Sequence, residues 1–318
     1  MTDFTLLPDL ASRLLGGGIV HADDEFFAAA DHLVLPSAPT FTPRTFDHKG
    51  QVYDGWETRR RRSPGTDSVV VRLGAPGVVR GVVVDTAFFT GNFPPFASLD
   101  AAVAEVWTPL VGKSPLEGDA RNLFEVSDER RFTHVRLTIH PDGGVARLRV
   151  HGEVVPDPAL LPSEFDVAAL EHGGRVVDCS NKFYGHPESM LMPGLAQHMG
   201  DGWETSRRRD DGNDWVIVRL AAPAVLTFAD LDTSHFKGNA PGSARLLGTV
   251  DQRDWFEILP RTALRPDTRH RFPLTADRPA THVRLDIYPD GGMARLRLLG
   301  RPDRDVLEEN FRRHVEPR

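Results

Sequence analysis

Short apolar runs, bounded by Gly, Pro or Asp, recur along the whole chain and predict β-strands. In the first half they lie at 69–73, 78–85, 102–108, 135–139 and 146–150. Residues 147–150 alternate polar and apolar side chains, as a half-buried strand does. The sequence Pro-Asp-Gly-Gly at 141–144 is typical of a hairpin turn, in which glycine supplies a positive φ. Short antiparallel strands at this spacing predict an all-β fold of the sandwich or jelly-roll type.

Helical patterns are confined to the two ends of the chain. One covers residues 7–15, and the other covers about 305–314, where Asp305 is a candidate N-cap. Neither pattern continues into the strand-rich middle, so helices are not expected to form a layer of the fold.

The chain contains an internal duplication. The sequence DGWET occurs at 54–58 and again at 201–205, an interval of 147 residues, and each copy is followed by a run of arginines. At an interval of 148 residues, THVRL at 133–137 returns at 281–285, and Pro-Asp-Gly-Gly also recurs. Because the interval changes so little, we interpret the halves as two copies of one fold.

The duplication sets the expected domain limits. The first repeat is predicted at 1–157 and the second at 158–318, because prolines between 156 and 162 interrupt any continuing element. The first repeat also has about ten additional residues within 37–53, a stretch rich in Pro, Ser and Thr that we interpret as a loop insertion. Each repeat is then a domain of ordinary size.

Composition and charge exclude several classes of protein. The formal net charge is −7 in 318 residues, which argues against a nucleic-acid partner because such proteins need a basic surface. The longest apolar runs are too short to span a membrane. Cys179 is the single cysteine, which excludes an intramolecular disulfide, and the beginning of the chain lacks the pattern of a signal peptide. A cytoplasmic protein is expected.

The arginine runs at 59–62 and 207–209 allow three interpretations. They could form a nucleic-acid patch, or line a solvated edge strand where charge prevents edge pairing. Alternatively, one arginine of each run binds a ligand carboxylate through two hydrogen bonds. The sequence alone leaves these open.

The two repeats differ at positions that could carry chemistry. The repeated Asp and Trp of DGWET are explained by a turn and a buried ring, whereas Glu57 and Glu204 are candidates for a general base or a ligand of an amide. His235, Lys237, Lys182 and His186 of the second repeat stand where the first repeat has Phe88, Thr90, Glu25 and Ala29. If His235 and Lys237 lie at a strand end, they point to the same side. The second repeat is therefore the expected host of a single site.

The repeated strings resemble those of the allantoicase family. The resemblance rests on DGWETRRRR at 54–62, DTAFFTGNFP at 85–94, SNKFYGHPESMLMPG at 180–194, MGDGWETSRRR at 199–209 and DTSHFKGNAP at 232–241. It implies two tandem jelly-roll domains of the galactose-binding-like type. It also implies hydrolysis of allantoate to (S)-ureidoglycolate and urea, in allantoin and purine degradation for nitrogen recycling.

The implied reaction needs a general acid, a general base and a group that binds a carboxylate. We expect Glu204 or Asp201 to be the base, His235 the acid, and Lys237 with the second arginine run, Arg207 and Arg208 included, to hold the carboxylate. Asn239 and Lys182 are expected to bind a ureido group. Asp54 and Glu57 complete the pocket if it lies between the repeats.

No ligand spacing in the sequence demands a metal, although carboxylate and imidazole groups could hold a divalent ion such as Mn²⁺. The expected partner is allantoate, and the sequence is compatible with a homo-oligomer. The alternative to an enzyme is a non-enzymatic β-sandwich that binds carbohydrates or small molecules, since a fold does not fix a function.

Overall fold

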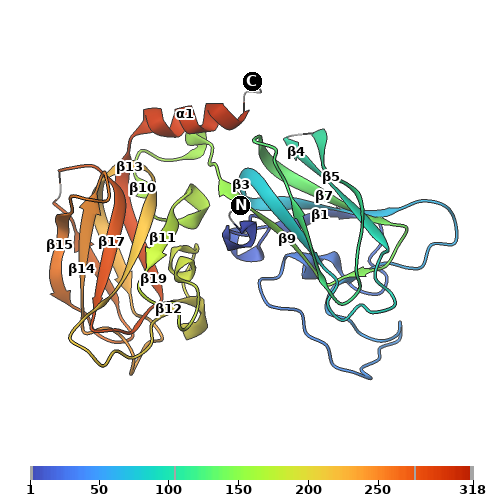
Figure 1. Ribbon diagram of the computed structural model, residues 1–318, viewed down its shortest axis with the longest axis horizontal. Helices are drawn as coiled ribbons and strands as arrows, with labels where there is room; N and C mark the ends of the chain where they lie inside the picture. The colour runs from blue at the N-terminus through green and yellow to red at the C-terminus, as the bar shows by residue number, and fades with distance from the viewer. Residues whose placement is uncertain (1–2, 104, 276, 316–318) are drawn as a thin grey trace. The chain divides into compact units, whose positions relative to one another are not determined.

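The computed structural model describes residues 3–103, 105–275 and 277–315. Two compact units form, one extending to Val155 and the other covering Pro156–Arg313. Figure 1 colours the first unit from blue to green and the second from green to red. The sheets of both consist of antiparallel strands, and the described residues contain a single α-helix, so the predicted all-β class with two repeats is confirmed.

The first unit contains one large sheet and one small one. The large sheet has the order β1 (Gly18–Ala22), β3 (Asp67–Asp85), β7 (Arg131–His140), β4 (Phe96–Val103) and β5 (Val106–Pro115), with β6 (Arg121–Glu125) and β9 (Arg147–Val154) also paired to β3. The small sheet pairs β2 (Trp56–Glu57) with β8 (Gly144–Val145).

The second unit repeats this plan. Its large sheet has the order β10 (Phe165–Asp166), β19 (Arg295–Pro302), β13 (Asp214–Asp232), β17 (Ala280–Tyr288), β14 (Ser243–Thr249) and β15 (Phe256–Ala263), with β11 (Arg175–Cys179) and β16 (Arg269–Pro273) paired to β13. The small sheet pairs β12 (Trp203–Glu204) with β18 (Gly292–Met293).

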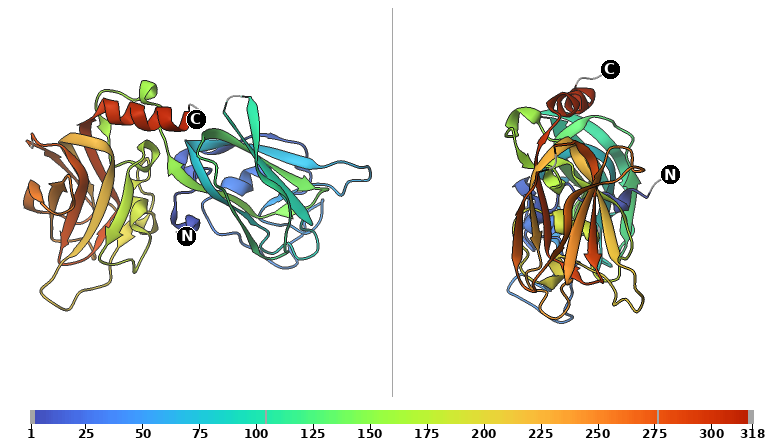
Figure 2. Two further views of the ribbon diagram at one scale, coloured as in Figure 1. Left: turned by 45° about the horizontal axis from the view of Figure 1, so that its top comes forward. Right: turned by 90° about the vertical axis from the view of Figure 1, so that its left-hand side faces the viewer.

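A long strand in each unit belongs to both layers of a sandwich. Residues 67–72 of β3 pair with β7 and, from residue 69, with β1. Residues 77–85 pair with β9 and, from residue 81, with β6, and residues 77 and 78 also keep the pairing with β7. The register shifts between Arg72 and Gly77, next to Pro76, which has no N–H to donate to a ladder. Because one strand belongs to both layers, the layers stay together and enclose an apolar core. The strands of each unit can be followed in Figure 2.

Several predicted strands differ from the observed ones. The runs at 69–73 and 78–85 are parts of the one strand β3. The prediction of a strand over 102–108 was wrong, because β4 ends at Val103 and β5 begins at Val106; residue 104 lies outside the described residues. The predicted hairpin at 141–144 was also wrong. Gly143 does have a positive φ of 140°, but β7 and β9 pair with different halves of β3.

The predicted helix over 7–15 was wrong. Two short 3₁₀ turns occur there, η1 (Phe4–Leu6) and η2 (Arg13–Leu15). Between them the chain is bound to β9 instead, because the Leu10 N–H donates to the Val150 carbonyl and the Val150 N–H donates to Asp9. Backbone groups used in this way cannot form the ladder of a helix.

The helix near the end of the chain is confirmed as α1 (Arg304–Val315). Its N-terminal N–H groups, those of Asp305 and Val306, are bound by the carboxylate of Asp303, so the predicted cap at Asp305 was two residues late. Further 3₁₀ turns are η3 (Ala30–Val34), η4 (Pro158–Leu160), η5 (Leu170–His172), η6 (Pro187–Leu191) and η7 (Met199–Asp201). Among the described residues, no helix has the length and apolar character needed to cross a membrane.

Segment 37–53 forms a loop on the first unit, as its composition predicts. Its backbone makes one isolated bridge, between Phe46 and Gln51. Two of its aromatic residues are only partly exposed, since Tyr53 stacks on Phe89 and Phe41 stacks on Tyr53. This loop therefore packs its own rings against the end of the sandwich.

Candidate functional site

The two glutamates of DGWET each bind an asparagine of the same repeat. The Asn239 amide donates to Glu204 Oε1 over 2.6 Å, and the Asn92 amide donates to Glu57 Oε1 over 2.8 Å. Glu204 lies on β12 and Asn239 in the turn after β13, so distant segments of the second repeat meet here. The duplication has preserved this pair in both repeats.

A buried tryptophan places each glutamate. Trp56 and Trp203 are 0% exposed, and each donates its indole N–H to a backbone carbonyl, that of Asp24 in the first repeat and Asn181 in the second. The side chains beside these carbonyls differ. Asp24 pairs with Arg59 over 2.6 Å, whereas Asn181 donates to Ser206 over 2.7 Å. The ring thus fixes the two-residue strand from which the glutamate projects.

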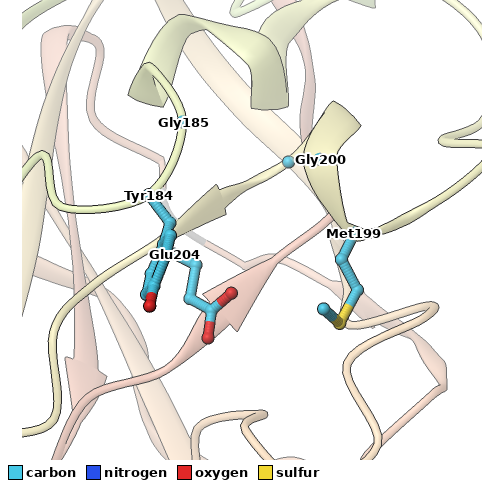
Figure 3. Close-up of a pocket in the computed structure, with 6 residues that line it drawn as sticks. Tyr184, Gly185, Met199, Gly200 and Glu204 are labelled. Carbon is cyan, nitrogen blue, oxygen red and sulfur yellow. The ribbon is translucent and has the colours of Figure 1, made fainter.

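A pocket of about 430 Å³ lies beside Glu204 in the second repeat. It is lined by Tyr184, Gly185, Met199, Gly200, Gly202 and Glu204. In Figure 3 the Glu204 carboxylate lies between the ring of Tyr184 and the side chain of Met199. Tyr184 is 56% exposed and Met199 is 45% exposed, so both side chains also reach solvent.

Backbone contacts hold Tyr184 beside Glu204. The N–H of each residue donates to the carbonyl of the other, both over 3.0 Å. The next residue, Gly185, has a φ of 70°, and a Cβ there would lie 2.6 Å from the Gly202 carbonyl oxygen. Only glycine allows this close approach, so the pocket wall depends on it.

His235 and Lys237 do not form the predicted cationic corner. Strand β13 ends at Asp232, so both residues lie in a turn, where His235 has a φ of 71°. His235 Nε2 donates to the Ala196 carbonyl over 3.0 Å. Lys237 is 79% exposed and lies 4.0 Å from Asp267. The prediction that the two side chains point to one side of a strand end was wrong, because a turn replaces the strand.

The two aspartates of DGWET have structural partners. Asp201 Oδ2 accepts the Gln197 N–H over 2.7 Å and closes the turn η7. Asp54 forms an ion pair with Arg147 over 2.8 Å, and Arg147 is 1% exposed. Burial disfavours the charged form of Asp54, but hydrogen bonds from Arg147 and Thr40 outweigh it and lower its pKa to about 2.

One arginine of each run turns inward and binds a carboxylate of the chain itself. Arg208 pairs with Asp214 over 2.9 Å, and Arg61 pairs with Asp67 at the equivalent place. Arg207 and Arg209 are exposed. Arg208 therefore already binds a carboxylate of the chain. The interpretation as an edge strand was wrong, because neither 59–62 nor 207–209 belongs to a strand.

Lys182 is exposed on the segment that leads to Tyr184. Glu188 follows six residues later, and its side chain is 13% exposed. Its carboxylate lies 3.7 Å from Arg175 and 3.9 Å from His186. Burial raises the pKa of Glu188 to about 7, although Arg175 and Lys182 oppose the rise. Burial, followed by the charge of Lys182, lowers the pKa of His186.

Comparison with known proteins agrees with the repeats. The family model described as the allantoicase repeat matches residues 8–155 and 165–303. A protein of Nocardia farcinica named probable allantoicase is 59% identical over 312 residues, covering 93% of this chain and 95% of that protein. The chain belongs to the allantoicase family.

Further members of the family are similar over the same length. The probable allantoicase of Streptomyces coelicolor is 47% identical and covers 98% of this chain and 90% of its own. The crystal structure of the Saccharomyces cerevisiae allantoicase superposes with a TM-score of 0.81 at 34% identity, covering 93% of both chains. The family expected from the sequence motifs is thus confirmed.

The sequence reasoning missed five of the six residues that line this pocket. Tyr184, Gly185, Met199, Gly200 and Gly202 were not among the predicted site residues. Tyr184 could have been found by comparing the repeats, because it is the polar counterpart of Phe27. These two residues are 157 apart, since the ten additional residues of the first repeat lie between Phe27 and the DGWET string. Gly200 could have been found in the same way, because residue 53 is Tyr in the first repeat.

The polar side chains that line the pocket are suited to acid–base chemistry. Its lining offers one carboxylate, Glu204, and one phenol, Tyr184. Within the residues that the structure describes, no group of three or more His, Cys, Asp or Glu side chains is arranged to hold a metal ion. One carboxylate without an imidazole beside it does not fit a divalent cation such as Mn²⁺.

Proposed function

We propose that the pocket of the second repeat hydrolyses allantoate to (S)-ureidoglycolate and urea. The observation that carries this proposal is the Glu204 carboxylate, which lines the pocket while one of its oxygens is held by Asn239. A carboxylate fixed through one oxygen can use the other to take and return protons. Membership of the allantoicase family supports the choice of substrate.

The reaction breaks one C–N bond of the carbon that carries both ureido arms. Glu204 removes the N–H proton of the arm that stays, the bond to the other arm breaks, and its nitrogen gains a proton as urea leaves. Water then adds to the C=N bond, giving its hydroxyl to carbon and its second proton to nitrogen. Glu204 ends each half-reaction in its starting state, so one carboxylate suffices for the proton transfers.

We assign the remaining roles from position. The hydroxyl of Tyr184, beside Glu204, is proposed as a hydrogen-bond donor to the departing ureido group. Lys182, exposed two residues before Tyr184, is proposed to bind the substrate carboxylate. His235 donates to the Ala196 carbonyl, so we propose that it positions the segment leading to Met199 instead of acting as the acid.

The decisive experiment is urea release from allantoate by the purified protein, with and without EDTA. We expect urea to form in both cases, because the proposed steps need no metal. Loss of activity with EDTA and recovery with Mn²⁺ would move the mechanism to metal chemistry. No urea from folded protein in either case would favour a non-enzymatic binding protein. The cytoplasm remains the proposed compartment.

Replacing Glu204 tests the proposed base directly. Glu204→Gln keeps the size of the side chain and its contact with Asn239 but cannot take a proton. We expect kcat/KM for allantoate to fall by about 10²- to 10⁴-fold, measured as initial rates of urea release. The control is Glu257→Gln, an exposed position on β15. Activity of Glu204→Gln close to that of the control would exclude Glu204 as the base.

A further inference from the structure

The first repeat contains the parts of a second pocket of the same kind. Its Glu57–Asn92 pair has the same atoms in contact as Glu204–Asn239. Both glutamates lie opposite a glycine of the small sheet, Gly144 or Gly292, whose N–H donates to the carbonyl of that asparagine. The framework that holds the carboxylate is thus duplicated together with the carboxylate.

An aromatic ring lies beside this framework in both repeats. A Cβ added to Gly144 would lie 2.0 Å from the ring of Phe89, and one added to Gly292 would lie 1.9 Å from the ring of Phe236. Both rings are 0% exposed. Phe89 and Phe236 therefore pack against the glycine that lies opposite each glutamate.

The two repeats differ in the side chains that pack on this ring. Over Phe89 lies the ring of Tyr53, with centroids 4.8 Å apart, and Phe41 stacks on Tyr53 at 5.2 Å and on Phe88 at 5.6 Å. Phe236 instead packs with Ala196 and with Ala294, and Ala294 has the buried counterpart Ala146 in the first repeat. The difference between the repeats is therefore the stack of aromatic rings on Phe89.

The residue equivalent to Tyr53 lines the open pocket. At the interval of 147 residues that relates the two DGWET strings, Tyr53 corresponds to Gly200, which has no side chain. Tyr53 and Phe41 both belong to segment 37–53, which holds the first repeat's additional residues. The loop that contains the insertion thus carries the rings stacked on Phe89, and Tyr53 stands at the position of the pocket-lining Gly200.

We propose that the first repeat holds a second, closed copy of the ureido-binding part of this site, built on Glu57, and that Tyr53 closes it. The native chain then binds one ligand, in the second repeat, and removal of the Tyr53 ring opens a second site at Glu57. This inference rests on the function proposed for Glu204. It identifies Tyr53 as the residue that decides which repeat binds.

The test counts binding sites by calorimetry with ureidoacetate. This molecule has a carboxylate and one ureido arm but no second arm to lose, so it binds without turnover. We expect one site per chain in the native protein and two in Tyr53→Gly, which copies the residue of the second repeat. Tyr53→Gly/Glu57→Gln should return to one, with the new site weakened about tenfold or more. The control Phe46→Gly changes a 68% exposed ring of the same segment and should keep one site.

Three results would overturn the proposal. They are two sites in the native protein, one site in folded Tyr53→Gly, or a second site that survives Glu57→Gln. Folding is checked by thermal unfolding and by kcat for allantoate, which should be unchanged because Tyr53 lies outside the second repeat. Tyr53→Ala is measured in parallel, since it opens the site without adding a flexible glycine.

The same measurements separate an error in the function proposed for Glu204 from an error in the proposal about Tyr53. A native protein that neither releases urea from allantoate nor binds ureidoacetate would reject the function proposed for Glu204, and this inference with it. A native protein that does both, with Tyr53→Gly still at one site, would reject only the closed copy.

Discussion

Glu188 shows how burial sets the charge of a side chain even when basic groups lie nearby. Its side chain is 13% exposed, and the basic groups nearest to it, Arg175 and His186, lie beyond hydrogen-bonding distance at 3.7 and 3.9 Å. Burial outweighs the opposing charges of Arg175 and Lys182 and raises the pKa of Glu188 to about 7. In the unfolded chain the same carboxyl ionises near its ordinary pKa of about 4.3.

This difference predicts how stability depends on pH. Below both pKa values the carboxyl is protonated in either state and contributes nothing, whereas ionisation between about pH 4 and 7 favours the unfolded state. Stability should fall across this window through Glu188. Glu188→Gln should therefore raise Tm relative to the native protein at pH 8 but much less at pH 4.5, measured by calorimetry.

The control for this prediction is Glu309→Gln, which changes a 73% exposed side chain of α1. It should shift Tm little at either pH. A Glu188→Gln protein with the same shift at pH 4.5 and 8 would show that packing, and not ionisation, causes the change.

At the scale of elements, the two-residue strand β18 connects the core to the candidate site. Gly292 lies opposite Glu204, its N–H donates to the Asn239 carbonyl, and the Phe236 ring lies against its Cα. A side chain at residue 292 must push this ring. The ring belongs to the turn that carries Asn239, so the glycine sets the Glu204–Asn239 distance.

Gly292→Ala should therefore reduce both stability and activity. We expect a loss of about 1–3 kcal/mol in unfolding free energy, because the added Cβ overpacks a closed core. We also expect at least a tenfold loss of kcat/KM, because Asn239 moves away from Glu204. Denaturant unfolding and urea release measure the two effects.

Gly144→Ala is the matched control, since its Cβ would lie 2.0 Å from Phe89 in the first repeat. It should cost similar stability and leave kcat/KM near the native value. Equal losses of activity in both variants would show that the effect is not local to the second repeat.

Sequence patterns predicted most of the architecture because strands and turns are local. The apolar runs within β3 and the 147-residue interval are visible in the sequence. The failures came from pairing at a distance. The segment 7–15 has a helical pattern, but hydrogen bonds to β9 replace the helix. Pro-Asp-Gly-Gly at 141–144 looks like a hairpin turn, but the strands beside it pair with β3.

The site was predictable in part for the same reason. The repeated glutamates and asparagines could be identified by comparing the halves, and both pairs are in contact. The sequence could not show which of the other polar side chains pair with groups of the chain itself and are therefore not available to a substrate. Asp54 binds Arg147 and His235 binds the Ala196 carbonyl, and these partners lie far away in the sequence. Arg208 binds the nearby Asp214, but only the fold shows that this arginine turns inward while Arg207 and Arg209 stay exposed.

At the scale of the whole molecule, the two repeats should respond differently to a ligand. Ureidoacetate at saturation should slow hydrogen exchange in segments 183–204 and 232–239 of the second repeat, because a ligand that binds the native state suppresses local opening there. Segments 53–57 and 85–92 of the first repeat should exchange as before. Mass spectrometry of peptic fragments measures this, and equal protection in both repeats would contradict the prediction.

The contacts around the two buried tryptophans have a consequence for recombining the repeats. The ion pair Asp24–Arg59 and the neutral pair Asn181–Ser206 occupy matching places. A chimaera that exchanged one partner alone would leave Asp24 facing a serine or Arg59 facing an amide, next to the carbonyl that holds the indole. Exchangeable modules of this protein must therefore carry both partners, so their smallest unit runs from residue 24 to 59, or from 181 to 206.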